Sequence, residues 1–143
     1  MITKHSLPKV LICDDDRNIH LAIKAALGNE YEIKSAYNGD EACIITKKNH
    51  IDIVLMDMEM RHAQEGLETI PKLHEIQNDL EIIFFSGQTG FEFVRSAMKV
   101  GAVDYVPKDA GPDELKHVFK KVLEIKNLKE KNPLQPLMIN FVA

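Results

Sequence analysis

The sequence predicts an α/β domain, a doubly wound five-stranded parallel sheet with helices on both faces. Strand-like and helix-like segments alternate along the 143 residues with short connections, as in a series of βα units. Two of the strand-like runs, residues 10–13 and 51–56, are mostly apolar, which is typical of parallel strands buried on both faces. A chain of this length with 45% hydrophobic and 28% charged residues suits one compact core.

The five predicted strands are short runs rich in β-branched, aromatic and other apolar residues. They cover residues 10–14, 31–36, 51–56, 81–85 and 103–106. The second is weaker than the first. Aspartates close the first strand and follow the third, and Ser86 and Gly87 follow the fourth.

Five predicted helices connect and follow these strands. They cover residues 17–27, about 40–48, about 66–77 and about 91–99, with a last helix that begins at Pro112. Gly28 ends the first helix, Asn38 offers a cap for the second, and Gly101 ends the fourth. Pro71 either kinks the third helix or lies in its first turn after Thr69.

The composition changes near residue 126. Residues 126–131 are rich in charge, residues 132–136 contain two prolines that favour an extended linker, and residues 137–142 are mostly apolar. We therefore expect a domain over residues 1–126 and a linker or docking tail over residues 127–143. The apolar end either docks on the domain or a partner, or is the stump of a longer protein.

Charge and composition argue against several classes of protein. The net charge of -4 and the pI near 5.8 speak against a nucleic-acid surface. No run reaches the roughly 18 apolar residues of a membrane span, and the N-terminus lacks a signal-like apolar core, so we expect a cytoplasmic protein. Cys13 and Cys43 lack metal-ligand spacing and are expected to be reduced small hydrophobes. We expect none of the six histidines to be a ligand or phosphocarrier.

Carboxylates end two of the predicted buried strands. Asp14, Asp15 and Asp16 follow the first apolar run, and Asp57 follows the third strand. In a parallel sheet the carboxyl ends of neighbouring strands share one edge, so these carboxylates are expected to converge where such sheets bind ligands. Converging carboxylates repel one another unless a proton or cation intervenes, and Mg2+ is the natural occupant. The pattern therefore indicates phosphoryl chemistry, with Asp16 expected to cap the first helix.

The chain resembles the receiver domains of two-component response regulators, the CheY-like family, over about residues 9–125. Four ordered signals at strand ends carry the resemblance. They are the acidic pair Asp14-Asp15, the aspartate Asp57, the pair Ser86-Gly87 and the lysine Lys108. The resemblance implies a flavodoxin-like sheet with strand order 2-1-3-4-5.

The resemblance also implies a role for each of these residues. Asp57 is the implied phosphoacceptor. Mg2+ is the implied cofactor, bound by the carboxylates of Asp15 and Asp57 and the backbone carbonyl of Glu59, with Asp14 acting through water. The residues implied to contact the phosphoryl group are Ser86, Gly87 and Lys108, and those implied to act as the switch are Ser86 and Tyr105.

Partners and output follow from the same resemblance. The implied phosphodonor is a sensor histidine kinase or a histidine phosphotransfer protein. The output is a downstream protein or an output domain beyond this chain, reached through the last helix, the last strand and the helix after Ser86. We expect no contact of this domain with nucleic acid or membrane. We also expect no enzymatic activity beyond phosphorylation and dephosphorylation of Asp57 itself.

The sequence departs from the family pattern at two places. Arg61 stands where the family usually has proline, and Gly66 comes one residue late. Because this loop carries the implied carbonyl ligand, its geometry is left open. Asp109 follows Lys108 where many members have a cis proline, so we expect the bond between them to be trans or strained.

Two other functions are consistent with these residues. Aspartate-nucleophile phosphatases of the haloacid-dehalogenase type also place an acid after a strand, with a second aspartate where this chain has Glu59. Multiple turnover on a phosphate ester would identify such an enzyme. The altered loop after Met60 also leaves open a receiver-shaped interaction module that is never phosphorylated. In a receiver, we expect the Glu59 side chain to tune the lifetime of the phosphoaspartate.

Overall fold

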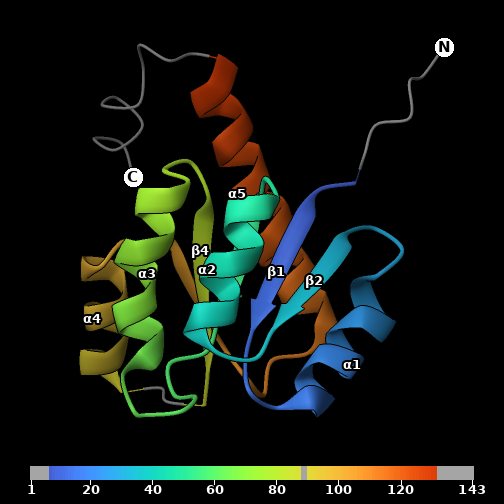
Figure 1. The fold of residues 1–143 in the computed structure, drawn as a ribbon. Helices are drawn as coiled ribbons and strands as arrows, with labels where there is room; N and C mark the ends of the chain where they lie inside the picture. Colours follow the sequence, from blue (N-terminus) through green and yellow to red (C-terminus); the bar gives the residue numbers. More distant parts are fainter. Residues whose placement is uncertain (1–6, 88–89, 132–143) are drawn as a thin grey trace, which may run out of the picture.

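The computed structural model describes residues 7–87 and 90–131. Within them five strands alternate with five helices (Figure 1). The strands are β1 (Lys9–Cys13), β2 (Glu32–Ala36), β3 (Ile53–Met56), β4 (Glu81–Ser86) and β5 (Asp104–Pro107). The helices are α1 (Arg17–Leu27), α2 (Gly39–Lys48), α3 (Glu65–Ile76), α4 (Phe91–Lys99) and α5 (Pro112–Lys131).

The strands form one parallel sheet in the order β2-β1-β3-β4-β5. This confirms the doubly wound fold and the strand order that the resemblance implied. The order reverses between β1 and β3, and doubly wound sheets bind ligands at such a point, outside the carboxyl ends of the strands. The carboxyl ends are in register there, with Cys13 of β1 opposite both Ala36 of β2 and Met56 of β3.

Alternate residues of the central strands pack into two apolar cores on opposite faces of the sheet. Leu11 and Val54 pack with residues of α2, α3 and α4. Ile12 and Leu55 pack with residues of α1 and α5. Figure 1 shows α2 and α3 in front of the sheet and α5 behind it. Because both faces are covered, the central strands are apolar without alternation.

Two helices start at side-chain caps. Asp16 accepts a hydrogen bond from Asn18 N (2.9 Å), which confirms its predicted role as the cap of α1. Asn38 accepts one from Glu41 N (2.9 Å), and α2 begins at the next residue. These bonds satisfy N–H groups that have no partner within the helix.

The structure selects one of the two placements that the sequence left open for the proline of α3. Pro71 lies well inside the helix and not in its first turn. A proline there removes one helical hydrogen bond. Ile70 and Leu73 on the same helix are fully buried, and this packing outweighs the lost bond.

Helix α5 continues to Lys131, past the change of composition at residue 126. Lys126 is buried, and its Nζ donates a hydrogen bond to the backbone carbonyl of Asp79 (2.7 Å). The predicted boundary between residues 126 and 127 therefore falls inside a helix. The apolar end of the predicted tail lies outside the described residues.

Candidate functional site

The sheet brings the predicted site residues together at its carboxyl edge. Just after β3, Asp57 N donates a hydrogen bond to Cys13 O (2.9 Å), and just after β5, Lys108 N donates one to Ser86 O (3.1 Å). Strand pairing therefore ends at the same level in neighbouring strands, and the loops begin there. A hollow of about 340 Å³ lies at this edge. Its lining residues are Asp15, Asp16, Asp57, Glu59, Ser86, Gly87 and Lys108.

Three aspartates form an acidic cluster in and beside this hollow. Asp14, Asp15 and Asp57 each offer a carboxylate oxygen, and these oxygens lie within 4.8 Å of one another. Asp14 and Asp57 are 2% and 6% exposed, whereas Asp15 faces solvent. Burial and the nearby Asp14 carboxylate raise the pKa of Asp57 to about 6, against the opposing effect of Lys108.

Lys108 supplies a positive charge between the two buried carboxylates. Its Nζ lies 2.8 Å from Asp14 Oδ2 and 3.2 Å from Asp57 Oδ2. Burial lowers the pKa of Lys108, but the two carboxylates outweigh burial and the net shift is upward. With three carboxylates and one lysine, the cluster retains excess negative charge, and its oxygen donors fit a hard divalent cation.

Ser86 and Tyr105 are connected at the end of β4. Ser86 is buried, and the half-buried Tyr105 donates its hydroxyl to the Ser86 carbonyl (3.3 Å). Burial, and then the charge of Asp109, raise the pKa of Tyr105. A Cβ added at Gly87 would meet no atom of the described residues within 4 Å.

Comparison with known families gives the family of this chain. The model of the response regulator receiver domain matches residues 10–120. The chain belongs to this family. As a receiver domain it is a phosphorylation-controlled part of two-component signalling.

Curated relatives of this receiver domain differ widely in length. It is 31% identical to protein-glutamate methylesterase/protein-glutamine glutaminase 1 of Methanosarcina mazei, over 95% of this chain but 39% of that protein. It is 27% identical to sporulation initiation phosphotransferase F of Bacillus subtilis, over 83% of this chain and 96% of that protein. The receiver domain therefore resembles nearly the whole of one relative and a part of a much longer enzyme.

Solved structures have the same fold. The receiver domain of a CheY-like protein from Methanospirillum hungatei is 26% identical and covers 87% of this chain and 99% of its own, with a TM-score of 0.80. A response regulator from Thermotoga maritima is 28% identical and covers 82% of this chain and 98% of its own, with a TM-score of 0.76.

Among the described helices of this receiver, none combines the length and apolar character of a membrane span.

The loop after Asp57 packs closely against Gly66, although Gly66 comes one residue later than in the family pattern. Gly66 N donates to Met58 O (2.8 Å), and a Cβ at Gly66 would lie 2.0 Å from the Asp57 carbonyl oxygen. Only glycine permits this approach. Further along the sheet edge, the bond between Lys108 and Asp109 is trans, as are the other peptide bonds of the described residues.

Sequence reasoning missed a buried histidine behind the acidic cluster. His20 of α1 is 2% exposed, with Nε2 2.7 Å from the Asp14 carbonyl oxygen and Nδ1 2.8 Å from Ser35 Oγ. It therefore holds the backbone of Asp14 in place. Its helical spacing to the buried Ile23 and Leu27 was the available signal, because it places His20 on the inner face of α1.

Proposed function

We propose that this receiver domain accepts a phosphoryl group on Asp57 in a Mg2+-dependent reaction. The observation that carries the proposal is the convergence of three carboxylates and Lys108 at one sheet edge beside an open hollow of about 340 Å³. A carboxylate oxygen of Asp57 would form a bond to phosphorus while the bond to the donor nitrogen of a phosphohistidine breaks, and the released imidazole takes up a proton.

The residues around Asp57 suit the charge of the transferred group. Asp15, Asp57 and the backbone carbonyl of Glu59 would hold Mg2+, with Asp14 acting through water, and the ion would neutralise phosphoryl oxygens. Lys108 lies 3.2 Å from Asp57 and is placed to contact another phosphoryl oxygen. The Ser86 hydroxyl and the Gly87 N–H supply further donors at the same edge.

The same contacts account for signalling by a conformational change. A shift from 1:99 to 99:1 needs about 5.5 kcal/mol of differential binding. Charge-assisted hydrogen bonds contribute roughly 1.5 to 3 kcal/mol each, so a few contacts from Ser86 and Lys108 suffice. Because the Tyr105 hydroxyl bonds to the Ser86 carbonyl, movement at Ser86 would reach Tyr105 and the surface of α4, β5 and α5. Phe91 and Met98 of α4 are exposed, as is Val103 just before β5.

A protein phosphodonor is favoured by an apolar hollow beside the site. This hollow of about 170 Å³ lies between α1 and the start of α5, and Ile19, Ala26, Lys108 and Leu115 are among its lining residues. Leu21 of α1 is 65% exposed nearby in the sequence. We infer that a histidine kinase or histidine phosphotransfer protein docks here, in the cytoplasm, and that a downstream protein or a further domain receives the signal.

Phosphorylation of the purified chain by a small phosphodonor with Mg2+ tests the proposal. One hydroxylamine-sensitive phosphoryl group is expected on the wild type and on Asp113→Asn, a control at an exposed aspartate of α5. None is expected on Asp57→Asn. Labelling that persists in Asp57→Asn contradicts the acceptor assignment, and a folded wild type that takes no label favours the interaction module instead.

A further inference from the structure

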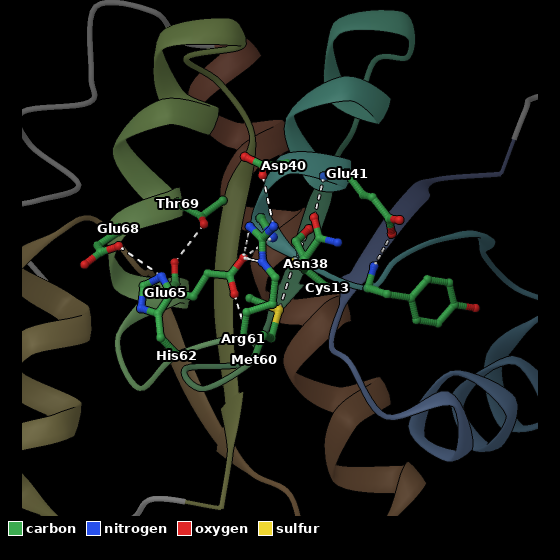
Figure 2. A network of polar contacts seen from close by, with 12 residues as sticks. Cys13, Asn38, Asp40, Glu41, Met60, Arg61, His62, Glu65, Glu68 and Thr69 are labelled. Atoms are coloured by element: carbon green, nitrogen blue, oxygen red, sulfur yellow. Dashed lines mark hydrogen bonds and ion pairs between the residues drawn. The ribbon is translucent and has the colours of Figure 1, made fainter.

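An arginine and a glutamate close the loop between β3 and α3. The Glu65 carboxylate accepts hydrogen bonds from the Arg61 backbone N–H (2.7 Å), from Arg61 Nε (3.0 Å) and from an Arg61 terminal nitrogen (2.6 Å). Figure 2 shows the Arg61 guanidinium beside this carboxylate. We call this pair of residues the clamp.

The clamp is also attached to the start of α2. Gly39 N donates to Glu65 Oε2 (2.7 Å), and a terminal nitrogen of Arg61 lies 3.1 Å from Asp40 Oδ2 (Figure 2). A Cβ at Gly39 would lie 2.2 Å from Thr69 Oγ1, so a larger residue here would require the Thr69 side chain to move. Glu65 thus accepts from two backbone N–H groups in different elements and from one guanidinium.

The Glu65 carboxylate is buried and charged. Its side chain is 4% exposed, and burial alone would raise its pKa. Hydrogen bonds from Arg61 and Gly39 outweigh burial and lower the pKa of Glu65 to about 2. Since the Arg61 side chain is 52% exposed, replacing it leaves the carboxylate with two backbone donors and no large cavity.

The clamp restrains the segment that carries Glu59. On one side of Glu59, the Met58 carbonyl accepts from Gly66 N (2.8 Å). On the other side, Met60 Sδ lies 3.6 Å from Cys13 Sγ, and the clamp follows at Arg61. These contacts restrain the backbone on both sides of Glu59.

We propose that Arg61 and Glu65 are positioning residues that hold the Glu59 backbone where its carbonyl can bind Mg2+. This inference rests on the proposed function of the site. In metal sites, residues that contact a direct ligand commonly orient it, and the clamp would do the same for the Glu59 carbonyl.

Mg2+ titration followed by backbone amide signals tests the proposal in the unphosphorylated protein. Arg61→Ala is expected to raise the Kd for Mg2+ by about 10-fold and to speed hydrogen exchange of amides 59–61 in the metal-free protein. Its phosphorylation rate should recover toward that of the wild type at saturating Mg2+, because the defect lies in ligand placement. Arg95→Ala, at an exposed arginine of α4, is the matched control and should leave the Kd unchanged.

Arg61→Lys keeps a positive charge without the paired donors and is expected to raise the Kd less than Arg61→Ala. It also serves if Arg61→Ala fails to fold. If folded Arg61→Ala binds Mg2+ with the Kd of the wild type, the inference is overturned and the clamp is only a structural feature. If only Arg61→Lys folds, a wild-type Kd in that variant has the same meaning. Failure of the wild type to accept phosphate would sink the proposed function instead, since Mg2+ binding is measured without it.

Discussion

The charge of Lys108 decides how two buried carboxylates are tolerated at one sheet edge. Its ammonium group lies within 3.2 Å of an oxygen of each, yet the pKa of Asp57 remains raised to about 6 by burial and by Asp14. One lysine therefore compensates only part of the repulsion. Carboxylate repulsion therefore remains in the metal-free site, and a bound cation would relieve it.

Removal of the Asp57 charge should stabilise the metal-free protein. The folded state holds the Asp57 proton more tightly than the unfolded chain, with a pKa of about 6 against 3.8, so stability falls as pH rises between these values. At pH 7 the ionised carboxylate costs about 2 to 3 kcal/mol. Asp57→Asn should therefore unfold at higher urea concentration than the wild type when a chelator is present. A midpoint at or below that of the wild type contradicts this account, and Asp113→Asn should show no change.

The two acids after β1 should contribute unequally to metal binding. Both oxygens of Asp14 already have neighbours, Oδ1 accepting from Asp16 N (2.9 Å) and Oδ2 lying 2.8 Å from Lys108, whereas Asp15 is exposed at the hollow. Asp15→Ala should therefore raise the Kd for Mg2+ by at least about 10-fold, and more than Asp14→Ala does. Calorimetric titration of both variants measures the difference. Equal or reversed losses would contradict the assignment of Asp15 as the direct ligand and Asp14 as acting through water.

Three elements meet at the loop that follows β3. The carboxylate of Glu65, at the start of α3, accepts hydrogen bonds from Gly39 at the start of α2 and from Arg61 in the loop. The helix N-termini place N–H groups there, which favours a negative charge. The stability of this junction therefore depends on the ionisation of Glu65.

Acid should weaken this junction selectively. Because the folded pKa of Glu65 is about 2 and its ordinary value is 4.5, its contribution is complete above pH 4.5 and is lost as pH falls toward 2. Glu65→Gln should cost about 2 to 3 kcal/mol near neutral pH and progressively less at pH 4 and pH 3, measured by urea unfolding. Glu75→Gln, at an exposed site of the same helix, should show no such convergence. A cost independent of pH would mean that packing and not charge stabilises the junction.

At the scale of the whole molecule, the proposed signal would pass from the acidic cluster to the surface of α4, β5 and α5. The connection runs along β4 and β5, whose register places Phe84 opposite Tyr105 and Ser86 opposite Pro107. Both faces of these strands are packed, so a change at Ser86 is not absorbed locally. Strand β2 lies at the opposite edge of the sheet.

A phosphate mimic should therefore perturb one side of the sheet. Beryllofluoride with Mg2+ is expected to shift the backbone amide signals of residues 86–110 far more than those of β2, because only states that bring Ser86 and Lys108 to the ligand gain from it. Lys108→Ala should still accept phosphate on Asp57 while the distant shifts shrink. If the mimic binds and residues 86–110 do not respond, the domain is a phosphoacceptor with a different switch.

The alternation of strands and helices, and the acids at strand ends, could be predicted from the sequence because they depend on local periodicity and on one rule of topology. Asp14 and Asp57 share an edge in any parallel sheet that pairs their strands, so their proximity needed no coordinates. The strand order needed the resemblance, since periodicity does not say which strands are neighbours. The sequence left the end of the last helix open, because the bond from Lys126 to the Asp79 carbonyl joins residues 47 positions apart.

Only the tertiary structure decided how the site is supported. His20 reaches the Asp14 carbonyl across a turn, and Glu65 reaches Gly39 across 26 residues of chain. Such bonds depend on distances of a few ångströms between elements, which are set by how whole faces pack. The identities of the reacting groups are local properties of the strand ends, whereas their orientation belongs to the packed molecule.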